Sequence, residues 1–145
     1  MSTPFTLRLQ RLADALVDQA HGGALCRKDS DYPFWSFQPV RPDASPLWFA
    51  GSSAWDVTVG FGRAGARVEL GFSTNVSDDE AMASLAAYCT AVMRGGLVEW
   101  RRGTRSSRWH LSFPDGTTDH GSANWLLPRL PWMSVQEERF QPYTR

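Results

Sequence analysis

The chain has 145 residues, of which 42% are apolar, and its fifteen basic residues balance fifteen acidic ones. This length is typical of one domain and suffices to bury a core without disulfide bonds or a structural metal. A net charge of zero excludes a global field that would draw the protein onto nucleic acid or an anionic membrane. No apolar run could span a bilayer and the first residues lack the order of a signal peptide, so we expect a cytoplasmic protein without a membrane partner.

The first residues predict an amphipathic helix over about 4–21. Pro4 suits the first helical position, apolar side chains recur at helical spacing after it, and Gly22 ends the pattern. The polar side of this helix is not basic, which favours packing on a sheet over binding to a membrane.

The next two segments predict strands. Between residues 26 and 53, prolines confine the chain to short strands at about 34–38 and 47–50, because proline cannot donate to a strand ladder. From 55 to 73, apolar and polar residues alternate on both sides of a glycine-containing connection, which predicts a hairpin with one buried face. We expect Trp55, Val57, Val59 and Phe61 to lie on that face.

A second helix is predicted over about 78–94. Ser77 and Glu80 form a capping box, in which the serine oxygen accepts a hydrogen bond from an unpaired backbone amide. Leu85, Cys89 and Val92 lie on one apolar stripe, and the Gly95–Gly96 pair ends the helix.

The residues after the second helix predict strands at 97–100 and 108–113 around a polar loop, 101–107, and then a short helix at about 122–127. We therefore expect residues 1–145 to form a single α+β domain, with residues 128–145 as a C-terminal strap. Its antiparallel sheet should have about five or six strands, with two amphipathic helices packed on one face, in the order α-β-β-β-α-β-β-α.

This order resembles the type III secretion chaperone-like module. The residues that carry the resemblance are the helix from Ser77 to Val92, set between the 55–73 hairpin and the 97–113 strands. The resemblance implies a domain that binds peptide segments of a partner protein, and a homodimer, because such modules commonly pair.

The two histidines His110 and His120 are the first candidates for chemistry. If Pro114, Asp115 and Gly116 form a three-residue turn, the two imidazoles face each other across neighbouring strands, whereas a two-residue turn places them on opposite faces. Asp119 would point away from both, so a third metal ligand is missing and no metal site is expected.

The cysteines and the glycine-rich segment do not form complete catalytic or nucleotide-binding patterns. Cys89 belongs to an apolar stripe and Cys26 has no histidine beside it in sequence, so neither is expected to be a nucleophile, and no disulfide is expected. Gly60, Gly62 and Gly65 match the spacing of a dinucleotide-binding loop, but the following residues alternate like a strand, which indicates a hairpin turn.

Arginine and tryptophan, which are enriched at binding hot spots, gather around the polar loop. Trp100 and Trp109 are in phase with the apolar positions Val98 and Leu111, so we expect both to be core. The candidate partner-binding residues are Arg101, Arg102, Arg105 and Arg108 as a solvated rim, with an exposed tryptophan as anchor, Trp35 or Trp48.

These observations favour a noncatalytic domain of the secretion-chaperone-like or immunity type that occupies one specific partner protein. Two alternatives stay open: a small nucleic-acid-binding protein that uses the Arg101–Arg108 loop, which is the less favoured partner class, and an enzyme whose site cannot be read from the sequence. No cofactor is expected.

Overall fold

A computed structural model describes residues 4–71, 76–102, 106–123 and 134–144. In these residues the chain forms two helices and nine strands. Their bounds are α1 Pro4–Ala20, β1 Ala24–Lys28, β2 Phe34–Pro39, β3 Leu47–Ala50, β4 Thr58–Phe61, β5 Ala66–Glu69, α2 Asp78–Met93, β6 Leu97–Arg102, β7 Ser106–Ser112, β8 Thr118–Ala123 and β9 Gln136–Arg139. None of the helices in this part of the chain is long and apolar enough to cross a membrane.

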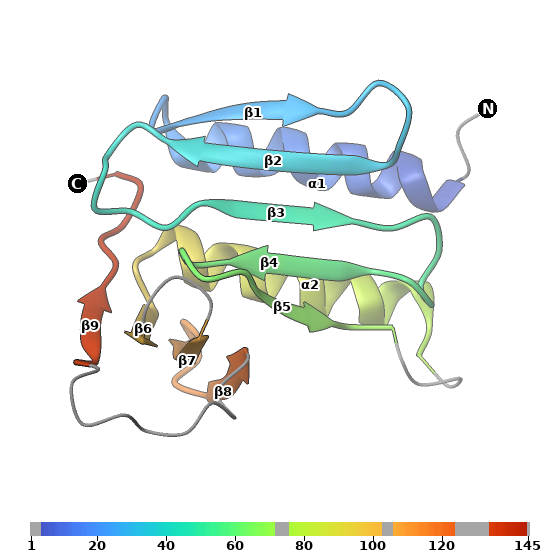
Figure 1. Ribbon diagram of the computed structural model, residues 1–145. Helices are drawn as coiled ribbons and strands as arrows, with labels where there is room; N and C mark the ends of the chain where they lie inside the picture. Colours follow the sequence, from blue (N-terminus) through green and yellow to red (C-terminus); the bar gives the residue numbers. More distant parts are fainter. Residues whose placement is uncertain (1–3, 72–75, 103–105, 124–133, 145) are drawn as a thin grey trace.

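The strands form two antiparallel sheets (Figure 1). The first has five strands in chain order, β1-β2-β3-β4-β5, and the second has four, in the order β8-β7-β6-β9. The α+β class is therefore confirmed, but the expectation of one sheet of five or six strands is wrong. Alternation of apolar residues indicates which side chains are buried, but it does not indicate which strands are hydrogen-bonded neighbours.

Helices α1 and α2 lie side by side behind the five-stranded sheet (Figure 1). Buried residues recur along α1 at Phe5, Leu9, Ala13 and Leu16, as the helical spacing predicted. They pack against the inner face of the sheet, where β2 and β3 contribute the large buried rings Trp35, Phe37 and Phe49.

The cap of α2 is the one that the sequence predicted. Ser77 Oγ accepts a hydrogen bond from the Glu80 backbone N–H at 3.1 Å, and Asp78, Asp79 and Glu80 occupy the positive first turn. Gly95 follows the helix with a φ of +80°, a conformation that glycine adopts without steric cost.

The second sheet packs beside the first through the core. The rings of Phe61 on β4 and Trp109 on β7 meet edge to face at 5.0 Å between centroids, and Leu97 and Leu111 are fully buried next to them. Strand β7 also contacts α2. One continuous apolar cluster therefore joins both sheets and both helices.

The C-terminal segment contributes a strand rather than only a strap. Strand β9 pairs with β6 at the edge of the second sheet. After it, the buried Tyr143 donates a hydrogen bond to the Ser45 carbonyl at 2.5 Å, and Gln141 bridges to Ala44. The prediction of a helix at 122–127 is wrong for residues 122 and 123, because they belong to β8. Residues 124–127 lie outside the described part of the chain.

The turns follow their sequence signals. The Phe113 N–H donates to the Thr117 carbonyl at 2.9 Å around Pro114, Asp115 and Gly116, whose φ is +90°. This is the three-residue turn that places His110 opposite His120. Strand β1 was not predicted, because its five residues show no regular alternation of apolar and polar side chains.

The hairpin from 55 to 73 is present as β4 and β5, with Val59 and Phe61 buried on its inner face. Trp55 is an exception, because it lies before β4 and 61% of its surface is exposed. The expectation that Trp55 is buried is therefore wrong. The last apolar residue of the pattern, at position 72, lies outside the described residues.

Candidate functional site

The outer face of the five-stranded sheet carries a tryptophan at its centre. The strand pairing aligns one residue from each strand into a single row: Arg27, Ser36, Trp48, Gly60 and Arg67. We call these five residues the Trp48 row. Because their neighbours Trp35, Phe49 and Val59 are buried against the helices, the Trp48 row faces away from both helices.

Trp48 is held in place by its neighbours. Its indole lies over Gly60, where a Cβ atom would come within 2.1 Å of the ring, and it stacks on Phe34 with 5.5 Å between centroids. Glycine in a strand interior often marks such a close approach. The partly exposed indole is therefore presented on a rigid sheet with little freedom left to lose on binding.

Two arginines flank this indole. Arg27 lies on the edge strand β1 and Arg67 on the edge strand β5, so the row extends over four strand spacings, about 19 Å. Both side chains are exposed, and neither is in an ion pair with another residue in the described ranges. The face thus combines an ordered aromatic centre with two available positive charges.

The other tryptophan proposed as an anchor is not available. Trp35 is only 1% exposed, since it points to the inner face of the same sheet and stacks on Phe49. Its indole N–H donates to Gln10 Oε1 at 3.0 Å, which joins β2 to α1. The prediction that Trp35 is a surface residue is wrong because the period-two pattern alone did not indicate which of Trp35 and Trp48 faces the helices.

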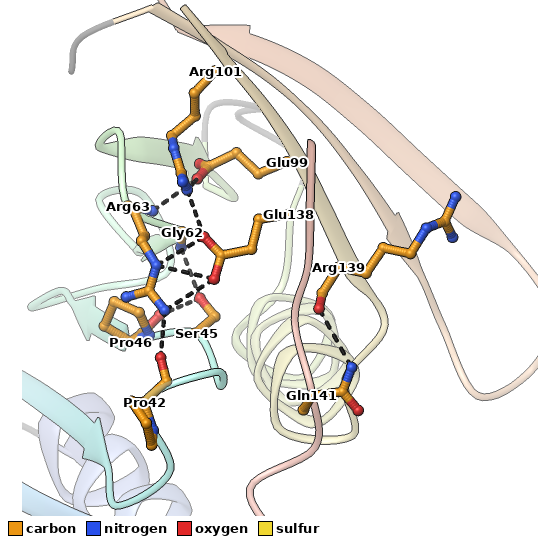
Figure 2. Close-up of polar contacts among 10 residues, drawn as sticks. All are labelled: Pro42, Ser45, Pro46, Gly62, Arg63, Glu99, Arg101, Glu138, Arg139 and Gln141. Carbon is orange, nitrogen blue, oxygen red and sulfur yellow. Dashed lines mark hydrogen bonds and ion pairs between the residues drawn. The ribbon is translucent and has the colours of Figure 1, made fainter. Parts of the chain in front are cut away.

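Arg101, expected in a solvated loop, belongs instead to an ion-pair network between the two sheets (Figure 2). Its guanidinium lies 3.0 Å from Glu99 Oε1 and 2.8 Å from Glu138 Oε1. Glu138 on β9 also binds Arg63, in the turn between β4 and β5, at 2.9 Å. Partial burial alone would raise the pKa of Glu138, but the bonds from Arg63 and Arg101 outweigh it and hold that pKa below its ordinary value.

Glu99 is the buried centre of this network. Its side chain is 0% exposed, and Oε1 accepts hydrogen bonds from Arg101 and from the Arg63 backbone N–H at 3.0 Å. Oε2 fills the space where a Cβ of Gly62 would be and has no hydrogen-bond partner among the described residues. The whole arrangement ties the β4–β5 turn to β6 and β9, which is a structural function.

The other arginines predicted to bind a partner are Arg102, Arg105 and Arg108. Arg102 is buried at the end of β6, with 8% of its surface exposed, and Arg108 is exposed on β7. Arg105 lies outside the described residues. The expectation of one solvated arginine loop from 101 to 107 is wrong, because β6 and β7 extend to Arg102 and Ser106 and pair there.

Trp109 is core, as predicted, whereas Trp100 is only partly buried. The two residues lie on opposite faces of the second sheet, since Trp109 pairs with Glu99 and Trp100 pairs with Arg108. The core partner of Trp109 is thus Glu99, an acidic residue that no apolar pattern would assign to the interior.

His110 and His120 are directly opposite each other on β7 and β8. Asp119 points to the other face, where it accepts a hydrogen bond from the Tyr88 hydroxyl. Burial and this bond raise the pKa of Tyr88. Within the described ranges, no group of three or more His, Cys, Asp or Glu side chains is placed to hold a metal ion.

The two cysteines differ in burial, and both have a raised thiol pKa. Cys89 is fully buried on α2, and burial raises the pKa of its thiol. Burial also raises the pKa of the half-buried Cys26, and both cysteines are free. Gly60, Gly62 and Gly65 lie in and after β4, in the β4–β5 hairpin, as predicted from the alternation.

Comparisons of the chain with protein families, with curated proteins and with solved structures gave no match. The sequence offered Trp48 as a candidate anchor, but it did not point to the residues that surround it in the structure, Phe34, Arg27 and Arg67. The available signal was Gly60, a glycine inside an otherwise regular strand pattern.

Proposed function

We propose that this chain is a noncatalytic protein-binding domain, of the secretion-chaperone-like or immunity type, that binds one specific partner protein on the Trp48 row. One observation carries the proposal: Trp48 is held against Gly60 and Phe34 on an open sheet face, between two arginines that form no ion pair within the described part of the chain. Trp and Arg are the residues most enriched among those that dominate binding energy at protein interfaces.

In this proposal Trp48 and the two arginines contribute to binding in different ways. A central indole that is already ordered loses little entropy when a partner covers it, so it contributes strongly to affinity. Charges at the rim mainly accelerate encounter with a partner of opposite charge. Arg27 and Arg67, at the two edges of the sheet, are placed for this second role.

A single-stranded nucleic acid is the second candidate, because aromatic side chains on a sheet face can stack on bases while arginines bind phosphates. Two features favour a protein partner over a nucleic acid. Glu69 lies on the same face as Arg67, two residues along β5, and the chain has no net positive charge.

The experiment compares three variants in recovery of a defined partner. Trp48→Ala and the double variant Arg27→Glu/Arg67→Glu should lose the partner, whereas Trp55→Ala should keep it. Trp55 is the matched control because it is an exposed tryptophan outside the row. Equal recovery by all three variants would contradict the proposal.

Two further measurements separate the alternatives. Sedimentation of the pure protein at several concentrations detects a homodimer, in which case Trp48→Ala should shift the equilibrium towards monomer. Retention of a single-stranded oligonucleotide that falls steeply with salt would favour the nucleic-acid candidate instead.

A further inference from the structure

The outer face of the second sheet is hollowed beside two histidines. A cavity of about 430 Å³ opens there, and its lining includes Trp100, Arg108, His110, His120 and Val135. This volume is within the range of small-molecule sites, roughly 300 to 1,000 Å³. The Trp48 row is on the other sheet, so the cavity is a separate feature of the molecule.

The strand pairing explains why these side chains meet. Trp100 on β6 pairs with Arg108 on β7, and His110, two residues further along β7, pairs with His120 on β8. Residues two apart on a strand share a face, and paired residues have Cβ atoms about 4.5 to 5.5 Å apart. All four side chains therefore project from one face of three adjacent strands.

The chemistry of the lining is one-sided. None of the described residues that line the cavity is acidic, while Arg108 carries a positive charge and the imidazoles of His110 and His120 supply N–H donors. Trp100 adds a flat aromatic wall, and its indole N–H donates to Glu137 Oε1 at 3.0 Å, which fixes the ring. A ring that carries an anionic group matches both features.

From this arrangement we propose that the cavity on the second sheet binds a small aromatic acid. The anionic group lies between Arg108 and the two imidazoles, and the ring of the ligand lies against Trp100. A divalent metal fits this site less well, because two imidazoles without a third protein ligand leave most of its coordination to water.

Other charged groups lie on this face. The buried Arg102, two residues after Trp100 on β6, shares it, and β9 contributes the pair Glu137 and Arg139, whose closest side-chain atoms lie 3.6 Å apart. Because Glu137 and Arg139 offset each other's charge, we assign recognition of the anion to Arg108 and the two imidazoles of the lining.

The test uses naphthalenesulfonate as the probe, since its sulfonate carries the negative charge that the site should recognise, and the neutral naphthalenesulfonamide as the matched ligand. Binding is followed by NMR shifts of the Trp100 indole N–H, assigned with Trp100→Phe. Arg108→Gln should weaken binding about tenfold or more, as expected for loss of a charged hydrogen bond. Arg11→Gln, which changes an exposed arginine on α1 that does not line the cavity, should leave affinity unchanged.

The histidines give a second, independent readout. In the full-length protein, His110→Leu/His120→Leu should weaken binding of the sulfonate about tenfold or more, because two N–H donors to the anion are lost. Circular dichroism establishes that each variant is folded, and either set of variants suffices if the other unfolds. Equal affinity for the sulfonamide, equal effects of the two arginine variants, or no shift of the Trp100 signal would each overturn the proposal.

Discussion

The indole of Trp48 on β3 lies directly against the bare backbone of Gly60 on β4. A Cβ atom at position 60 would come within 2.1 Å of the indole Cε2 and Nε1 atoms. Phe34 stacks on the same indole from the strand on the other side. The orientation of the most prominent ring on the open sheet face therefore depends on the absence of a side chain in its neighbour.

This relationship predicts the effect of Gly60→Ala. The added methyl group should displace the Trp48 ring and destabilise the fold by about 1 to 3 kcal/mol, as overpacking does. In a Trp48→Ala background the same change should cost much less, because the ring is gone. Urea denaturation of the four proteins in this double-mutant cycle measures the difference, and additive effects would contradict the prediction.

The cap of α2 provides a second prediction. Ser77→Ala removes the oxygen that accepts the Glu80 N–H and should lower the free energy of unfolding by about 0.5 to 2 kcal/mol. Ser77→Asp keeps an acceptor at the cap and serves as the control. An unchanged denaturation midpoint in Ser77→Ala would show that this hydrogen bond does not stabilise the helix.

The ion-pair network predicts acid sensitivity. Because Arg63 and Arg101 hold the pKa of Glu138 low in the folded state, its contribution to stability is present above the ordinary glutamate pKa of about 4.3. That contribution is lost as the pH falls through the lower folded-state value. Glu138→Gln should therefore be less stable than the parent near neutral pH, and the difference between them should shrink on acidification.

Thermal unfolding followed by circular dichroism at a series of pH values measures this difference. Glu137→Gln is the matched control on the same strand, since Glu137 lies on the outer face and does not contact Arg63. If the difference in stability between the parent and Glu138→Gln stays constant with pH, Glu138 is not an ionised, paired residue in the folded protein.

The two cysteines should differ in reactivity. Cys89 is fully buried with a raised thiol pKa, so it should react with iodoacetamide only after unfolding. Cys26 is partly accessible and should be modified slowly in the native protein, faster at higher pH because burial also raises its pKa. Intact-mass measurement counts the labels, and a mass two hydrogens lower without reductant would reveal an unexpected disulfide.

Periodicity in the sequence was sufficient to predict both helices and the β4–β5 hairpin, and a local motif was sufficient to predict the cap at Ser77. Each of these features depends on contacts between residues close in the chain. For the His110–His120 pair the sequence left two registers open. The structure has the three-residue turn of Pro114, Asp115 and Gly116, which places the two histidines opposite each other.

Only the tertiary structure decided that the strands divide into two sheets, that Trp35 is buried while Trp48 faces outward, and that Arg101 is joined to Glu99 and Glu138. Each of these features depends on residues far apart in the chain, such as Arg63 and Glu138. A pattern of alternating polarity gives two equivalent faces to a strand, and the helices that pack against one of them determine which face is exposed.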